Sequence, residues 1–266
     1  MQRNIEVREN ITVIELPRKK LQVDVYSNVN TTVPATAIIF LPGGSWLTAN
    51  RKPLAERFAI PLANLGHVCV TAEYRVASEA EWPLQVQDIK SVVNWIRTNC
   101  IELGVDKNNI VVAGKSAGGH LALLSSGVEY IDSKIQTSSD TTVAAVVAIA
   151  PVIDVHSMIG REDIAPFLGL HPSDETIDNA SPINHISPKY PPTLLIHGTS
   201  DQRVHHGPTI NMHKELEKHG VPTDLVLFAG QGHSLDSDPN FSQAMVDSID
   251  FFISRYVTNN ETSELE

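Results

Sequence analysis

The sequence predicts an α/β fold in which a mostly parallel sheet is covered by helices on both faces. Short runs rich in β-branched and apolar residues alternate along the chain with stretches whose apolar residues recur at helical spacing. Some runs, such as residues 35–41 and 143–150, are almost continuously apolar, which is typical of strands buried on both faces. The chain has 266 residues and is 42% hydrophobic, so it can bury the core of one such domain, expected over residues 1–266.

The elements follow one another in a regular order. Residues 11–16 and 21–26 are separated by Pro-Arg-Lys-Lys and predict an antiparallel hairpin at one edge of the sheet. The later strands are expected at residues 35–41, 67–74, 109–113, 143–150, 193–197 and 223–228. The helices are expected at residues 52–65 with an irregularity at Pro61, at 83–100, in the stretch after Gly118, and at 207–219 and 240–257.

Two segments interrupt this alternation. The polar residues 133–142 predict a loop. Residues 151–190 are rich in proline and carry only short apolar patches, which indicates a lid-like insertion or short helices over the carboxyl edge of the sheet. The alternative is an ordinary surface excursion.

The composition excludes several classes of partner. The formal net charge is −11 and no long basic run is present, which argues against nucleic acid and anionic membrane surfaces. No apolar stretch is long enough to insert into a membrane, so we expect a soluble protein, either cytoplasmic or exported with its signal peptide already removed. The two cysteines, Cys69 and Cys100, are expected to be small buried side chains and not a disulfide pair.

The strongest functional signal lies at residues 109–122. A β-like run meets Gly-Lys-Ser-Ala-Gly at residues 114–118, and a helical pattern of small and apolar residues follows at once. Glycine suits both ends of this turn because a Cβ there would obstruct the close passage of the helix over the strand. A five-residue motif of this kind is short enough to occur by chance in some chains. The prediction therefore depends on the strand before it and the helix after it. Ser116 is therefore the candidate nucleophile.

A serine nucleophile needs a base to take its proton and an acid to orient that base. His233 lies in a glycine-rich loop beyond the strand at residues 223–228, and Asp201 lies in the loop after the strand at 193–197. The ends of parallel strands meet at one edge of a sheet, so these side chains are expected to converge on Ser116. Asp236, Asp238 and Asp154 are weaker acid candidates, and His205 and His206 are expected to face solvent.

The loop at residues 42–46, Pro-Gly-Gly-Ser-Trp, is the candidate oxyanion hole. It directly follows the strand at residues 35–41, and backbone N–H groups are dipoles already in place when negative charge develops. Its glycines let the backbone approach a ligand closely, and the N–H of Ala117, which follows the nucleophile, is expected to complete the set of donors. Lys115, beside the nucleophile, is expected to pair with a surface carboxylate; the alternative is that it favours an acidic substrate.

Together with Glu-Tyr-Arg-Val-Ala at residues 73–77, these motifs resemble the α/β-hydrolase fold. Within that fold they are most similar to small carboxylesterases of the hormone-sensitive-lipase and bacterial feruloyl/acetyl esterase type, including kynurenine formamidase relatives. The resemblance runs from about residue 20 to residue 257. It implies that Ser116, Asp201 and His233 match the catalytic triad of the family.

The resemblance also implies that Gly44, Ser45 and Ala117 match the oxyanion-hole donors. The loop of the family usually begins with His-Gly-Gly, whereas this chain has Pro42 in place of the histidine and Ser45 in place of the third glycine. Proline has no N–H and a fixed φ, so this loop is anchored differently.

The leading hypothesis is a serine carboxylesterase that cleaves short-chain acyl esters, such as acetyl esters, through an acyl-enzyme intermediate. Its partner is a small-molecule ester, and no metal or cofactor is implied. The alternatives are an aryl-formamidase or amidase, or a ligand-binding member of the fold that does not catalyse. The expected pocket walls are Trp46, Tyr74, Ile153 and Phe167.

Overall fold

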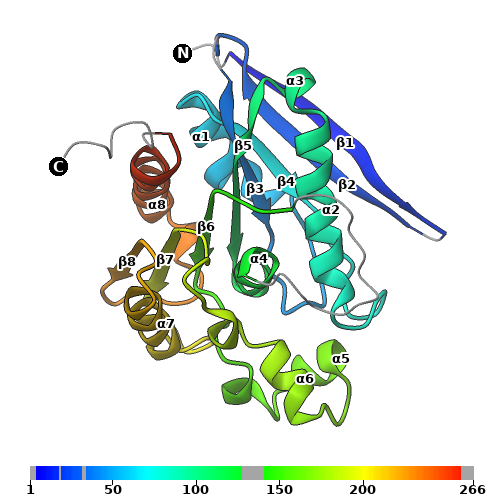
Figure 1. Ribbon diagram of the computed structural model, residues 1–266, viewed down its shortest axis with the longest axis vertical. Coiled ribbons are helices and arrows are strands. Elements are labelled where there is room, and N and C mark those ends of the chain that lie inside the picture. Colours follow the sequence, from blue (N-terminus) through cyan, green and yellow to red (C-terminus); the bar gives the residue numbers. More distant parts are fainter. Residues whose placement is uncertain (1–3, 18, 32–33, 128–140, 259–266) are drawn as a thin grey trace.

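The computed structural model describes residues 4–17, 19–31, 34–127 and 141–258. Within these residues, eight strands form one sheet in the order β1-β2-β4-β3-β5-β6-β7-β8 (Figure 1). The pairs β1/β2 and β2/β4 are antiparallel, and all other neighbouring strands are parallel. The predicted mostly parallel α/β sheet is therefore confirmed.

The strands lie where the sequence predicts them. The leading hairpin, β1 and β2, is longer than expected, and β1 forms the predicted edge. The central strands β3, β4 and β6 are buried at every position, as their continuous apolar runs require. The bounds are β1 Ile5–Leu16, β2 Lys19–Asn28, β3 Ala35–Leu41, β4 Val68–Ala72, β5 Val105–Lys115, β6 Ala145–Ile149, β7 Thr193–Gly198 and β8 Thr223–Phe228.

Helices follow the strands in the predicted alternation. The irregularity expected at Pro61 is present as a π-helical turn, η1, that runs into a short α-helix, α1. The longer helices are α2 Leu84–Thr98, α4 Ala117–Gly127, α7 Gly207–Lys218 and α8 Pro239–Ile253, and the short segments near them are η1 Ala55–Ala59, α1 Ile60–Asn64, α3 Cys100–Leu103, η4 Leu235–Ser237 and η5 Ser254–Thr258.

The sheet separates two apolar cores. On one face, α2, α4 and α7 pack against side chains such as Ile39, Val112 and Leu195. On the other face, η1, α1 and α8 pack against Ile38 and the alternate residues of the same strands. Figure 1 shows α2 and α4 together on one side of the sheet and α1 and α8 on the other. The helices on both faces leave the carboxyl edge of the parallel strands for the site.

The segment at residues 151–190 folds into short helices. This agrees with the first of the two expectations and not with an ordinary surface excursion. They are η2 His156–Met158, α5 Ile164–Leu168, α6 Asp174–Asn179 and η3 Pro182–His185. In Figure 1, α5 and α6 lie beyond the end of the sheet at which α4 begins. Ile164, Phe167 and Ile177 are buried in the core that α2 and α4 share, so the segment is packed against the rest of the chain. The loop predicted over residues 133–142 falls, up to residue 140, outside the described residues.

Candidate active site

Ser116 stands on a sharp turn between β5 and α4. Its φ is 55°, a left-handed conformation that is rare for a residue with a side chain and typical of a strained functional turn. The turn depends on two glycines. A Cβ on Gly114 would overlap the carbonyl oxygen of Gly118, and a Cβ on Gly118 would overlap that of Leu41. The close passage expected from the sequence is therefore present.

The structure brings Ser116, His233 and Asp201 into one hydrogen-bonded series. Ser116 Oγ lies 2.9 Å from His233 Nε2, and His233 Nδ1 lies 2.7 Å from Asp201 Oδ2. A carboxylate only accepts, so Nδ1 of His233 carries the proton and Nε2 is free to accept from the Ser116 hydroxyl. This is the geometry that general-base activation of a serine requires.

The loops after β7 and β8 hold the acid and the imidazole together. Ser200 N donates to the carbonyl oxygen of Gln231 at 2.9 Å. A Cβ on Gly198 would overlap that same oxygen, so only glycine lets the two loops approach this closely. The contact places Asp201 directly beside His233.

Asp201 is buried and held by several donors. Its Oδ1 accepts the N–H groups of Arg203 and Val204 at 2.8 and 2.9 Å. Burial alone would raise the pKa of Asp201, but the hydrogen bonds from His197, His233 and the Val204 N–H together hold it well below its usual range. The carboxylate is therefore ionised and can stabilise a protonated His233.

His197 is a site residue that the sequence analysis missed. Its Nε2 lies 2.9 Å from the Val204 carbonyl oxygen and 3.2 Å from Asp201 Oδ2, and its Nδ1 lies 2.8 Å from Thr209 Oγ1. Both acceptors face Nε2, so Nε2 donates and Nδ1 accepts from the threonine. The signal was its position four residues before Asp201 in the same strand-end motif.

The weaker acid candidates have other partners. Asp236 pairs with Lys115 and Arg57, Asp238 caps α8 by accepting from Asn240 N, and Asp154 accepts from His156 N. Of the two histidines expected to face solvent, His205 is exposed and His206 is partly buried, with its ring 6.3 Å from that of His197. Neither lines the cavity at Ser116 described below.

The glycine-rich loop after β3 runs beside the nucleophile. A Cβ on Gly43 would lie 3.2 Å from Ser116 Cβ, which shows how closely the loop passes. Gly44 and Ser45 both have positive φ, 138° and 53°. Within the described residues, their N–H groups donate to no backbone carbonyl. Ala117 is the first residue of α4, and its N–H has no acceptor inside the helix. The three expected donor N–H groups thus have no backbone acceptor within the described residues.

The nucleophile opens on a small cavity of about 340 Å³. Ser116 and His233 line it together with Gly44 and Ser45, so the hydroxyl, the base and the proposed oxyanion loop face one space. The remaining lining residues are Pro42, Gly43, Asn50, Pro53, Leu54, Arg57, Lys115, Arg203 and Asp236. A wider outer groove, lined by residues 160–163 and Gln202 among others, shares Gly44, Ser45 and Arg203 with it.

Three cationic side chains line this inner cavity. Lys115 and Arg57 each pair with one oxygen of Asp236, whose side chain is fully buried. Lys115 therefore pairs with a carboxylate as expected, but that carboxylate is buried and not at the surface. Arg203 instead donates from Nη2 to Ser45 Oγ at 2.8 Å.

The structure corrects the expected pocket walls. Trp46 is 1% exposed and Tyr74 is 0% exposed, and neither lines the cavity at Ser116. The Trp46 ring stacks on Phe167 with centroids 4.4 Å apart, and the Tyr74 hydroxyl donates to the Pro42 carbonyl oxygen at 2.9 Å. Phe167 and Ile153 are likewise core residues. The two aromatic side chains therefore anchor the loop at residues 42–46 to the core and do not line the cavity.

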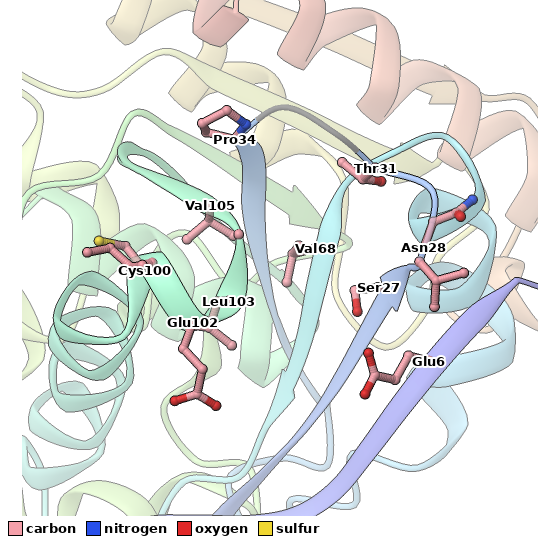
Figure 2. A pocket seen from close by; sticks show the side chains of 13 residues that line it. Glu6, Ser27, Asn28, Thr31, Pro34, Val68, Cys100, Glu102, Leu103 and Val105 are labelled. Carbon is pink, nitrogen blue, oxygen red and sulfur yellow. The ribbon is translucent and has the colours of Figure 1, made fainter.

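A second cavity, of about 550 Å³, lies at the opposite edge of the sheet (Figure 2). Val68 and Val105, the first residues of β4 and β5, line it, together with Glu6 and Glu102. Ser116 follows the carboxyl end of β5, so this cavity is remote from the nucleophile. Within the described residues, no group of three His, Cys, Asp or Glu side chains is placed to hold a metal ion, and no helix is long and apolar enough to cross a membrane.

Comparison with known proteins agrees with this geometry. The BD-FAE family matches residues 23–216. The esterase LipC of Mycobacterium tuberculosis is 38% identical over 183 residues, which are 64% of this chain and 45% of LipC. The chain therefore spans less than half the length of this relative.

Two solved structures share the fold over almost their whole length. An acetyl ester-xyloside bifunctional hydrolase from Caldicellulosiruptor lactoaceticus superposes with a TM-score of 0.80 at 25% identity, covering 92% of this chain and 95% of the other. A propionate-bound esterase from Thermogutta terrifontis gives a TM-score of 0.80 at 26% identity, covering 95% and 94%.

The fold and the Ser-His-Asp arrangement define the class: the chain is an α/β-hydrolase. Within that class it belongs to the BD-FAE family, whose match covers well over half of its length.

Proposed function

We propose that the protein is a carboxylesterase that hydrolyses short-chain acyl esters through an acyl-enzyme on Ser116. The observation that carries the proposal is the hydrogen-bonded series from Ser116 Oγ through His233 to Asp201, with Ser116 and His233 facing one cavity. The esterases among its relatives support the same reaction.

The reaction follows from the positions of the atoms. Ser116 Oγ attacks the ester carbonyl carbon while His233 Nε2 takes the hydroxyl proton. The tetrahedral intermediate then collapses, the C–O bond to the alcohol breaks, and His233 gives its proton to the departing oxygen. A water molecule, deprotonated by the same Nε2, attacks the acyl carbon and releases the acid and free Ser116.

Two features lower the barrier of these steps. The N–H groups of Gly44, Ser45 and Ala117, which have no backbone acceptor in the described residues, are the proposed donors to the carbonyl oxygen as it becomes negative, and one such donor typically contributes a factor of about 10²–10³ in rate. Asp201 stays ionised and stabilises the imidazolium that forms on His233.

Small acyl groups are the proposed substrates. The inner cavity of about 340 Å³ matches a small acyl group, and a long chain would have to extend into the outer groove. The propionate and butyrate bound in structures of the Thermogutta terrifontis esterase, and the acetyl esters in the name of the Caldicellulosiruptor lactoaceticus hydrolase, support acyl groups of two to four carbons.

Labelling with a fluorophosphonate tests the nucleophile. The native protein is expected to be modified at Ser116, and Ser116→Ala is expected to remain unmodified and to lose turnover of p-nitrophenyl acetate. A labelled protein that cleaves formanilide faster than the acetate would be a formamidase. A native protein that neither labels nor turns over either compound would be a ligand-binding member of the fold.

A further inference from the structure

The inner cavity has a positive charge that the chain as a whole does not share. Arg57, Lys115 and Arg203 line it with a single carboxylate, Asp236. His233 is neutral when it acts as a base, so the lining side chains carry a net charge of +2, and the ionised Asp201 behind His233 reduces the local charge to +1. The formal net charge of the protein is −11. A positive cavity in an acidic protein marks the part of the surface that attracts anions.

Two of the three cations are already held in place. Lys115 Nζ and Arg57 Nη1 occupy separate oxygens of Asp236, and the Asp236 side chain is 0% exposed while that of Arg57 is 35% exposed. The carboxylate is thus covered by its own partners and does not present a bare negative charge to a ligand. Lys115 and Arg57 together carry two positive charges against the one negative charge of Asp236, so this group keeps a net charge of +1.

Arg203 differs from the other two. Within the described residues, its guanidinium forms no ion pair, and its side chain is exposed at the junction of the inner cavity and the outer groove. Its one side-chain contact is the 2.8 Å hydrogen bond to Ser45 Oγ. The Ser45 hydroxyl that it contacts also interacts with Asp163. The guanidinium therefore has donors left over, next to the loop proposed to bind the ester oxygen.

The outer groove does not share this charge. Arg161 and Asp163 pair with each other at 3.1 Å, and Glu162 is exposed beside them. The positive excess is confined to the inner cavity, within reach of Ser116.

We propose that the site takes esters that carry a carboxylate in their acyl or alcohol part, and that Arg203 binds this carboxylate beside the scissile ester; this substrate class rests on the proposed esterase function. The planar fork of a guanidinium pairs with a carboxylate through two parallel hydrogen bonds. The backbone of Arg203 donates to Asp201, so its position relative to the triad is fixed.

Two matched pairs of esters test the substrate class. In the alcohol arm, 4-acetoxybenzoate is compared with its neutral methyl ester; in the acyl arm, monomethyl succinate is compared with methyl butyrate. The native protein is expected to prefer the acid by about tenfold in kcat/KM in at least one arm, the size of one charge-assisted hydrogen bond, mainly through a lower KM. The preference is expected to decrease as the NaCl concentration rises.

The variants separate the local charge from the net charge. The preference is the ratio of kcat/KM for the acid to kcat/KM for the neutral ester, taken within each variant. Arg203→Gln is expected to reduce this ratio to about twofold, and Arg203→Glu to reverse it. Arg8→Gln is the matched control, because it removes the same charge from the remote hairpin, where Arg8 pairs with Glu102. It is expected to keep the full preference.

Each outcome is decisive. Turnover of the neutral esters with no preference for the acids in either arm overturns the anion site alone and leaves the esterase function standing. A preference that survives in Arg203→Gln overturns the role of Arg203. The absence of Ser116-dependent turnover for all four esters overturns the proposed function itself.

Discussion

Trp46 donates its indole N–H to Nδ1 of His120 across 3.2 Å, and both rings are buried. The other ring nitrogen of His120 lies 2.7 Å from the carbonyl oxygen of Ala180. A carbonyl only accepts, so Nε2 carries the proton and the imidazole is neutral. One neutral side chain on α4 thus joins the loop at residues 42–46 to the segment at residues 151–190.

Substitution of His120 separates these two hydrogen bonds. In His120→Asn, the amide oxygen can take the place of Nδ1 and accept from Trp46; in His120→Gln, the amide nitrogen can take the place of Nε2 and donate to Ala180. Displacement of the loop would move the N–H groups of Gly44 and Ser45 away from the developing charge. We expect His120→Gln to lose about tenfold in kcat and His120→Asn to lose clearly less, measured with p-nitrophenyl acetate. Equal kcat in the two variants would contradict this role of the Trp46 bond.

His120 also makes the stability of the protein depend on pH. Burial lowers its pKa to about 4 from the usual 6.5. Between these values the unfolded chain binds a proton that the folded chain does not, so stability is full above pH 6.5 and decreases as the pH falls toward 4. From pH 7.5 to 4.5, this loss amounts to about 2.5 kcal/mol.

Urea unfolding at these two pH values measures the effect. The free energy of unfolding is expected to fall by about 2.5 kcal/mol more in the native protein than in His120→Asn, which has no imidazole to titrate. An identical loss in both proteins would mean that another group accounts for the acid sensitivity.

The sequence predicts some parts of this site much better than others. Ser116, Asp201 and His233 each follow the carboxyl end of a parallel strand, and such ends share one edge, so their convergence could be predicted from the order of elements. The sequence could not predict that the Trp46 side chain points into the core. Ser45 and Trp46 both have positive φ, at 53° and 59°, a conformation that their residue types do not indicate, and it turns the indole into the core.

The sequence also does not predict the positive charge of the inner cavity. Lys115, at the end of β5, pairs with Asp236 across 121 positions of the chain, and Arg57 pairs with the same carboxylate from η1. The packing of η1 and η4 at one edge of the sheet brings these side chains together, and no local pattern encodes it. Of the three cations that line the cavity, Arg203 is the one with no ion pair among the described residues, and only the folded chain reveals this.

Asp201→Asn is expected to abolish most of the activity while the fold is retained. Oδ1 of Asp201 accepts two backbone N–H groups, so the asparagine must place its oxygen there and its NH₂ group toward His233. That NH₂ group donates to His233 Nδ1 and moves the imidazole proton to Nε2, where it can no longer accept from Ser116. A decrease in kcat of about 10³–10⁴ is expected, with KM little changed.

Asp238→Asn is the matched control for this variant. Its side chain caps α8 by accepting from Asn240 N, which an asparagine can also do. We expect its kcat to equal that of the native protein. A loss of less than tenfold in Asp201→Asn would assign the orientation of His233 to another group.

Gly118→Ala tests the close passage of α4 over the end of β3. A Cβ at this position overlaps the carbonyl oxygens of Leu41 and Pro42, which belong to the backbone and cannot move aside as a flexible side chain would. Gly220→Ala is the control: its Cβ meets open space, and it carries only the cost of a φ of 72°, about 1 kcal/mol. In urea unfolding, Gly118→Ala is expected to lose about 3 kcal/mol or more, because overpacked backbone must shift. The same backbone shift displaces the turn at Ser116. The fraction of Gly118→Ala that folds is therefore also expected to have a lower kcat. If Gly118→Ala were as stable and as active as Gly220→Ala, the tight contact between the helix and the strand end would not be what positions the serine.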